Sequence, residues 1–303
     1  MKRIVVFIIC MELLIGCIDK KNHQEIRGMI VVQSDFGVKD GAVAAMRGVA
    51  MGVDASLVIA DLTHEIPPYD IWEAAYRLNQ VISYWPANTV FVSVVDPGVG
   101  TERRSIVVKT KKDHYIVTPD NGTLTLVAES EGIAAVRLID EEINRRQGSE
   151  SSHTFHGRDV YIYTAARLAS GKISFEEVGP VLQEALTTFP YQHAEIAGGI
   201  IKGNIPVLDL PYGNVWTNIP DSILENTGFK TGDSLEVRIS FKDSMRYTGK
   251  IFFANTFGDV PESQPLGYIN SLMNFSIAVN MGSFADKYAI KSGPDWNIQL
   301  GRR

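Results

Sequence analysis

The sequence predicts an α/β domain with a mostly parallel sheet, followed by a smaller all-β, barrel-like domain. Apolar strand-like runs alternate with helical patterns from Gly28 to about Gly179, an order typical of a parallel sheet covered on both faces. After the polar stretch 186–193, short β-rich runs are separated by Gly, Pro and Asn turns, which favours a barrel or sandwich. The boundary is therefore placed near residue 190, giving domains 28–190 and 191–303.

Five strands are expected in the first domain: Met29–Val32, Leu57–Leu62, Thr89–Val95, Ser105–Thr110 and His114–Thr118. The segment Lys111-Lys112-Asp113 separates the last two strands and predicts a hairpin. Helical spacing of apolar residues predicts helices over Lys39–Gly52, from Asp70 to about Trp85, and over Arg158–Ala169.

Asp70 is expected to cap the second helix, because Glu73 follows three residues later as in a capping box. Strands of the second domain are expected at Gly198–Lys202, Val207–Leu210, Ser234–Ile239, Tyr247–Phe253 and Ser276–Val279.

The first 17 residues are predicted to be a lipoprotein signal peptide that lies outside the fold. Lys2 and Arg3 precede the apolar run Ile4–Met11, which is too short to span a bilayer. The segment Leu14-Ile15-Gly16-Cys17 resembles the lipobox of bacterial lipoproteins. This resemblance implies cleavage before Cys17 and lipidation of its thiol.

Residues 18–27 are polar and charged, and they are interpreted as a flexible tether. The mature protein is expected to be exported and held at a membrane by its lipid anchor alone, in the periplasm or at the cell surface. If the signal is not processed, the alternative is an apolar tail on a cytoplasmic protein.

Composition excludes several classes of function. The formal net charge of −6 argues against nucleic-acid binding. The two cysteines, Cys10 and Cys17, both lie in the predicted signal peptide. Disulfides, cysteine metal sites and cysteine nucleophiles are therefore not expected in the mature domains.

The loop that follows Thr89–Val95 carries the first candidate chemistry. This run is β-branched and aromatic, so it predicts a strand buried on both faces. The run ends at Asp96, at the strand end where open α/β sheets bind ligands. Pro97 and two glycines then form a tight loop that returns at Arg103. If this loop stood alone, a structural ion pair would be the favoured explanation, and the other loops change that interpretation.

Other loops add functional groups that can converge at the same sheet edge. Asp35 follows the first strand, and its carboxylate can accept hydrogen bonds from both hydroxyls of a ribose. Asp96, Arg103 and His156 form a set that can hold and polarise a water molecule. His153 and His156 have HxxH spacing, but no helix or carboxylate accompanies them, so no metal site is expected.

At these residues the chain resembles the S-adenosyl-L-methionine (SAM) hydroxide adenosyltransferases, which are SAM hydrolases related to the SAM-dependent fluorinase and chlorinase. The matching stretches are SDFG, THEI, VVDPGVGTERR, TPDNG, FHGRD, LPYGNVWTNI and INSLMNFSIAVN. The resemblance implies an α/β domain followed by a β-barrel. It also implies a homotrimer, with SAM bound between the N-terminal domain of one subunit and the C-terminal domain of its neighbour.

The resemblance also implies the reaction and the residues that perform it. The reaction is cleavage of SAM to adenosine and L-methionine, with SAM as the substrate and no cofactor. Asp96, Arg103 and His156 match the water-activating residues. The implied substrate contacts are Asp35 and Asp40, Tyr69 near the sugar and adenine, Asp209 and Ser271 at the methionine end, Tyr212 and Asn214 in the adenine pocket, and the backbone of Val279 at adenine.

Departures from the relatives leave alternatives open. The halogenating relatives carry Tyr in place of Asp96 and Tyr-Ser in place of His156-Gly157. A carboxylate at this position would repel a halide, so water or hydroxide is the expected nucleophile. Ala42 and Ser276 also depart from the family pattern, which leaves the choice of adenosyl substrate open. The alternatives are a SAM-dependent halogenase and a lipoprotein that binds SAM or adenosine without turnover.

Overall fold

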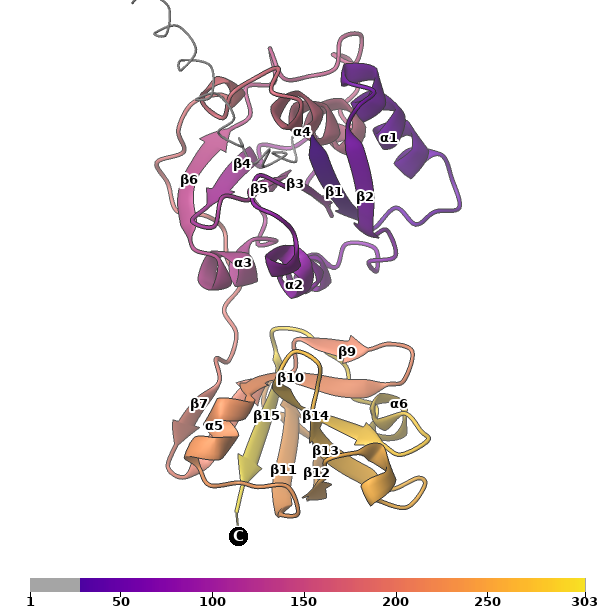
Figure 1. The fold of residues 1–303 in the computed structure, drawn as a ribbon, viewed down its shortest axis with the longest axis vertical. Helices are drawn as coiled ribbons and strands as arrows, with labels where there is room; N and C mark the ends of the chain where they lie inside the picture. Colours follow the sequence, from indigo (N-terminus) through magenta and orange to yellow (C-terminus); the bar gives the residue numbers. More distant parts are fainter. Residues whose placement is uncertain (1–27, 303) are drawn as a thin grey trace, which may run out of the picture.

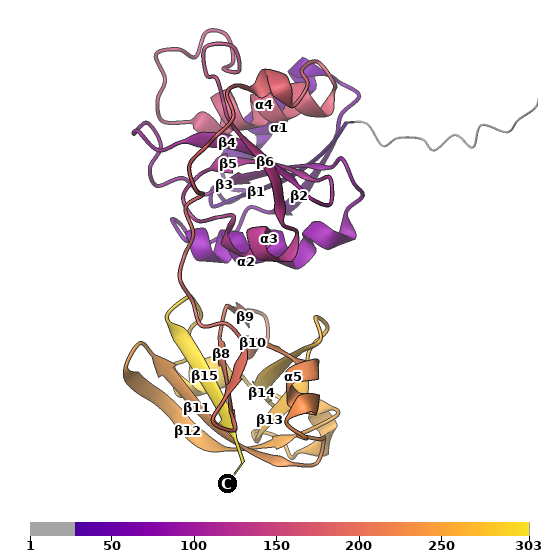
Figure 2. The same ribbon diagram turned by 90° about the vertical axis from the view of Figure 1, so that its left-hand side faces the viewer.

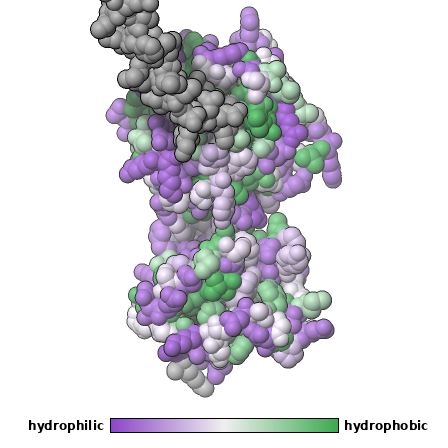
Figure 3. Space-filling model, viewed as in Figure 1, coloured by the Kyte–Doolittle hydropathy of each residue, from purple (hydrophilic) through white to green (hydrophobic). Residues whose placement is uncertain are grey.

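The computed structural model describes residues 28–302, which form two domains arranged one above the other (Figure 1). The outline of the molecule narrows between them (Figure 3). The predicted signal peptide 1–17, the lipidation site Cys17 and the tether 18–27 lie outside the described residues. Within 28–302, no helix has both the length and the apolar character that crossing a bilayer requires.

The first domain contains a six-stranded sheet in the order β2-β1-β3-β5-β4-β6. Its neighbouring pairs from β2 to β5 are parallel, and β4 is antiparallel to both β5 and β6. The prediction of a mostly parallel sheet is thus confirmed. The strands are β1 (Met29–Ser34), β2 (Val58–Thr63), β3 (Val90–Val94), β4 (Ser105–Thr110), β5 (Tyr115–Pro119) and β6 (Ile133–Leu138).

Helices cover both faces of this sheet (Figure 2). Helices α1 (Ala42–Val53) and α4 (Ile162–Ala169) lie on one face, and α2 (Ile71–Val81) and α3 (Thr125–Ser130) lie on the other. Alternate residues of β1 enter the two cores: Ile30 and Val32 pack with α1 and α4, whereas Val31 packs with α2. This alternation follows from the two-residue period of a strand, and it explains why apolar runs lack polar breaks.

Local signals in the first domain are confirmed at two points. The Asp70 side chain accepts a hydrogen bond from the Glu73 amide at 2.9 Å and so caps α2. The expected cap by Asp70 is thus present. The Glu73 carboxylate pairs with Arg77, one turn further along the helix. The hairpin between β4 and β5 turns at Asp113, which has a φ of 62°.

The second domain is a nine-stranded sheet in the order β7-β8-β15-β11-β12-β13-β14-β10-β9, with helices α5 (Asp221–Asn226) and α6 (Phe284–Tyr288). These pairings leave β7 and β9 at the ends of the order, so closure into a barrel is not confirmed for the described residues. The strands are β7 (Glu195–Ala197), β8 (Ile200–Asn204), β9 (Val207–Asp209), β10 (Asn214–Pro220), β11 (Ser234–Phe241), β12 (Ser244–Phe253), β13 (Pro265–Ile269), β14 (Asn274–Val279) and β15 (Trp296–Gly301).

Helix α2 contacts both the chain between the domains and the second domain itself. The Trp72 indole Nε1 donates a hydrogen bond to the Pro206 carbonyl at 2.9 Å. Its ring also packs edge-on against Phe189 and Tyr191. The chemistry-bearing loops of the first domain emerge from other elements, described next.

Candidate active site

The centre of the candidate site is an ion pair between Asp96 and Arg103. Strand β3 ends at Val94, and Asp96 therefore stands just beyond its carboxyl end. Arg103 lies just before β4, and its Nε donates to Asp96 Oδ1 at 2.8 Å while Nη2 contacts Oδ2. Two parallel contacts of this kind fix both groups in orientation as well as distance. The carboxylate and the guanidinium are thus held as one rigid unit.

Gly100 brings this loop against the loop that carries His156. Its φ is +77°, and a side-chain Cβ there would lie 2.7 Å from the His153 carbonyl oxygen. Only glycine fits such a close approach of two backbones. The glycine therefore explains how residues far apart in sequence share one site.

His156 completes the cluster predicted from the sequence. It stands at the start of a π-helical turn, η2 (Gly157–Tyr161), which runs into α4. Its Nδ1 lies 2.9 Å from Arg103 Nη2. Burial lowers the pKa of His156, and the nearby Arg103 and Arg145 add to that shift against the opposing effect of Glu141. The ring is therefore favoured in its neutral form, which can accept a proton.

Tyr161 is a buried member of this cluster that the sequence analysis missed. Its hydroxyl donates to Asp96 Oδ2 at 3.1 Å, and its ring lies under the Arg103 guanidinium at 5.4 Å. Burial raises the pKa of Tyr161 well above its usual value, so it acts as a donor. A carboxylate has about four acceptor positions. The contacts from Arg103 and Tyr161 occupy three of them, which leaves one on Oδ1 for a water molecule.

Tyr161 follows His156 by five residues, and the two rings meet edge-on at 6.4 Å. An ordinary α-helix places residues three or four apart on one face, whereas a π-helical turn bonds residues five apart. The π turn thus supplies a pairing that a search at helical spacing would not find.

A cavity of about 300 Å³ opens beside this cluster. Asp96 and His156 line it together with Asp35 and Tyr69. The remaining lining residues are Phe36, Pro68, Val94, Val99, Thr154, Phe155 and Gly157. The cavity therefore also carries the Asp35 carboxylate, the residue predicted to contact a ribose.

Asp35 holds Tyr69 in an unusual backbone conformation. Asp35 Oδ2 accepts a hydrogen bond from the Tyr69 amide at 2.9 Å. Tyr69 has a φ of 69°, which is uncommon for a bulky residue, and its side chain is 72% exposed. Such strain is often found at ligand sites. The hydrogen bond uses one carboxylate oxygen and leaves Asp35 Oδ1 available.

The remaining predicted substrate residues do not reach this cavity. Asp40 is exposed, and its carboxylate accepts a hydrogen bond from the Ala42 amide at 2.9 Å. The other five lie in the second domain, and none of them lines the 300 Å³ cavity: Asp209, Tyr212, Asn214, Ser271 and Val279. In a single chain, the residues predicted for the sugar and those predicted for methionine and adenine are thus separate.

Within the second domain, three of these residues do cluster. Asn214 Nδ2 donates to Asp209 Oδ2 at 3.1 Å, and the Tyr212 amide donates to the Asp209 carbonyl oxygen at 3.1 Å. The turn between β9 and β10 therefore presents Asp209, Tyr212 and Asn214 together. Tyr212 is 68% exposed there.

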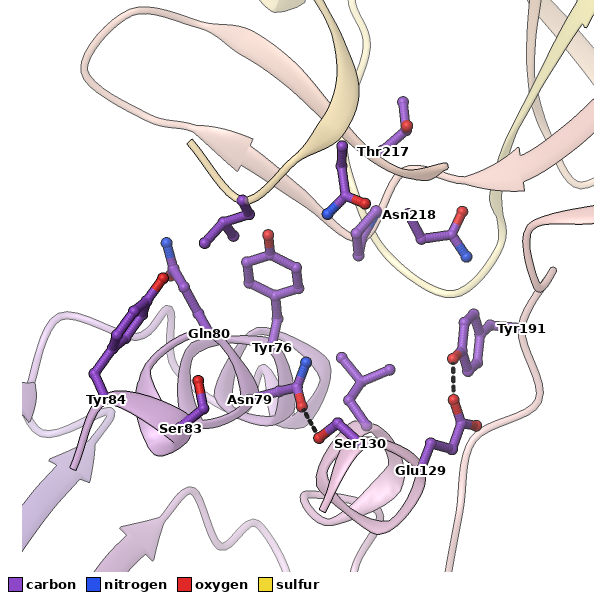
Figure 4. A pocket seen from close by; sticks show the side chains of 14 residues that line it. Tyr76, Asn79, Gln80, Ser83, Tyr84, Glu129, Ser130, Tyr191, Thr217 and Asn218 are labelled. Carbon is purple, nitrogen blue, oxygen red and sulfur yellow. Dashed lines mark hydrogen bonds between the residues drawn. The ribbon is translucent and has the colours of Figure 1, made fainter. Parts of the chain in front are cut away.

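A larger cavity of about 490 Å³ lies between the two domains (Figure 4). Tyr76 of α2 points from one side towards Thr217 and Asn218 of β10 on the other, and Asn79 of α2 accepts a hydrogen bond from Ser130. Hydroxyl and amide groups dominate its polar lining, and its one acidic residue, Glu129, bonds the Tyr191 hydroxyl. The smaller cavity is lined by the acid Asp96 and the imidazole of His156, and the cation Arg103 contacts both, so the chemistry is assigned there.

Two family models match the chain. The model described as the SAM hydroxide adenosyltransferase N-terminal domain matches residues 30–179. The corresponding C-terminal domain model matches residues 203–297.

Named relatives and a solved structure resemble the chain over most of its length. An (R)-S-adenosyl-L-methionine hydrolase of Methanocaldococcus jannaschii is 34% identical, covering 78% of this chain and 82% of that protein. One of Salinispora tropica is 33% identical, covering 88% and 96%. A fluorinase of Actinoplanes is 27% identical, covering 88% and 95%. The crystal structure of an uncharacterized conserved protein from Thermotoga maritima superposes with a TM-score of 0.81 at 34% identity, covering 90% of this chain and 100% of the other.

Proposed function

The chain belongs to the SAM hydroxide adenosyltransferase family, and we propose that it hydrolyses S-adenosyl-L-methionine to adenosine and L-methionine. The observation that carries this proposal is the contact of Asp96, Arg103 and His156 beside the cavity that also holds Asp35. Relatives at 33–34% identity carry the name (R)-S-adenosyl-L-methionine hydrolase. The (R) epimer of the sulfonium is therefore included among the substrates to test.

Water attacks C5′ of the ribose on the side opposite the sulfonium. The new bond joins the water oxygen to C5′, and the C5′–S bond breaks with its electron pair passing to sulfur. Methionine leaves as a neutral thioether, so no acid has to protonate it. Asp96 Oδ1 holds the water and takes the proton that the water loses, and neutral His156 beside Arg103 remains as a second proton acceptor.

Positioning is the main contribution that the protein makes to the rate. Asp35 holds the ribose hydroxyls, and the rigid Asp96–Arg103 pair holds the water in line with the sulfonium. Alignment of this kind is worth roughly 7–11 kcal/mol in favourable cases. Phe36, Val94 and Val99 give this part of the cavity an apolar lining, which disfavours bulk water beside the reacting groups.

Water is favoured over halide as the nucleophile. A halide needs neutral donors to replace its hydration shell, whereas Asp96 presents a carboxylate to the cavity. Arg103 balances this charge and is already bonded to both carboxylate oxygens. The halogenase alternative therefore lacks a donor set suited to an anion.

The complete site forms between copies of the chain in a homotrimer. The cavity beside Asp96 is lined by first-domain residues alone, and the exposed turn with Asp209 and Tyr212 belongs to the second domain. A neighbouring copy supplies that turn to the open side of the cavity. Large apolar side chains exposed on the second domain suit such an interface: Leu210, Tyr212, Met273 and Met281.

The protein works outside the cytoplasm, tethered by a lipid on Cys17. The support is the order of a basic start, an apolar run and a lipobox-like Leu14-Ile15-Gly16-Cys17.

Incubation of the purified protein with SAM, followed by chromatography, tests the activity. We expect adenosine and methionine in equal amounts, from the (R) or the (S) epimer supplied separately. Chloride or fluoride in the buffer should give no 5′-halogenated adenosine. Bound but unchanged SAM would indicate the binding lipoprotein, and a halogenated product would indicate the halogenase.

A further inference from the structure

The catalytic cluster closes into a ring through residues that the proposed mechanism does not use. Arg103 Nη1 donates to Ser105 Oγ at 2.7 Å, and Ser105 Oγ donates to Glu141 Oε1 at 3.1 Å. Glu141 Oε2 forms an ion pair with Arg145 Nη2. Arg145 Nη2 in turn lies 3.2 Å from Nε2 of His156, whose Nδ1 faces Arg103. The ring thus runs from one side of the imidazole to the other.

This ring places a guanidinium at each nitrogen of His156. A neutral imidazole has one lone pair, and an imidazolium has none. Arg103 and Arg145 therefore cannot both donate to the imidazole. A protonated imidazole would direct an N–H at a cation on each side. The arrangement opposes protonation of His156 in the resting enzyme.

The Glu141 carboxylate has the opposite effect on His156: its negative charge favours the protonated imidazole. It bonds Arg145 directly and reaches Arg103 through Ser105. The Arg145 side chain is only 10% exposed, so its charge is poorly screened by solvent. Asp96 and the Tyr161 ring edge are the other charged or titratable groups that face the histidine.

We propose that Glu141 and Arg145 form a positioning pair that fixes the orientation and protonation state of His156 during hydrolysis. Neither residue lines the cavity, so both act through the histidine. The inference rests on the proposed function, because it assigns His156 a proton-accepting role.

If Glu141 and Arg145 act as such a pair, Arg145→Gln and Glu141→Gln should shift the His156 pKa in opposite directions. Arg145→Gln removes a positive charge that lowers the His156 pKa, so that pKa should rise. Because the ring must be neutral to accept a proton, the acid limb of kcat/KM moves to higher pH. Glu141→Gln removes a negative charge that raises the pKa, so the pKa falls and the limb moves to lower pH.

The experiment measures both kcat/KM against pH and the imidazole titration of His156 by nitrogen NMR. The His156→Asn variant assigns the His156 resonance. Arg145→Lys keeps the charge and should restore a limb near that of the wild type. Arg77→Gln is the matched control: Arg77 pairs with Glu73 at the same spacing of four residues, on α2 outside the cavity. It should leave both measurements unchanged.

Opposite shifts of the His156 titration in the two variants, with no shift in Arg77→Gln, would support the pair. Unchanged titrations, or shifts in the same direction, would overturn it even if the wild-type enzyme hydrolyses SAM. If the wild-type enzyme does not hydrolyse SAM, the proposed function fails, while the NMR titration still decides whether the pair sets the state of His156.

Discussion

Replacement of Asp96 by asparagine is expected to lower kcat for SAM hydrolysis by about 10²–10⁴-fold, the usual contribution of a positioned acid–base group. The amide keeps the size of the side chain but removes the negative charge that orients the water and balances Arg103. Because Asp96 holds the water and not the methionine or adenine end, KM should change much less. Steady-state kinetics with SAM separate the two parameters.

Asp120→Asn is a matched control for this variant. Asp120 is also a buried carboxylate near the end of a neighbouring strand, and it forms an ion pair with Arg104 and accepts the Thr187 amide at 2.8 Å. It does not line the cavity. Asp120→Asn should lower the melting temperature as much as Asp96→Asn does and leave kcat close to wild type. A kcat near wild type in Asp96→Asn would remove Asp96 from the mechanism.

Mixing two inactive variants should restore activity if sites form between copies. One variant carries Asp96→Asn in the first domain, and the other carries Asp209→Ala with Tyr212→Ala in the second. In a ring of three with random mixing, about one site in four combines an intact first domain with an intact second domain. Co-expression should therefore recover up to about a quarter of wild-type activity from two nearly inactive proteins.

The result of mixing also depends on whether the two variants assemble with each other. Light scattering on the mixture checks that the copies associate. Associated copies with no more activity than the sum of the separate variants would contradict a site shared between neighbours. A single-chain site would behave in that way, because each copy would keep one defective half.

The fold and the site differ in how far the sequence could predict them. Strand β3 was predictable because all its residues are buried, which leaves a continuous apolar run that ends at Asp96. The half-buried edge strand β6 shows no such run, and β7 has only three residues. Strand β15 lies between β8 and β11, which are distant in sequence. Local patterns carry no information on such pairings.

The inner cluster was predictable, whereas its supports were not. Asp96, Arg103 and His156 stand in recognisable loops, and the structure brings them within hydrogen-bonding distance. Glu141 and Arg145 lie in the irregular segment between β6 and η2. Such a segment has no helical or strand periodicity from which the direction of a side chain could be predicted. Their contacts with His156 depend on how this segment folds back over the sheet. Asn121 is an intermediate case: it belongs to the turn motif TPDNG, and its side chain donates to the Val95 carbonyl at 2.8 Å beside Asp96.

The central claim is that a water molecule held by Asp96, Arg103 and His156 attacks C5′ of SAM. Hydrolysis in water enriched in ¹⁸O, followed by mass spectrometry of both products, tests it most directly. We expect one ¹⁸O atom in the 5′-hydroxyl of adenosine and none in methionine. Unlabelled adenosine, or label in methionine, would contradict attack by water at the sugar carbon.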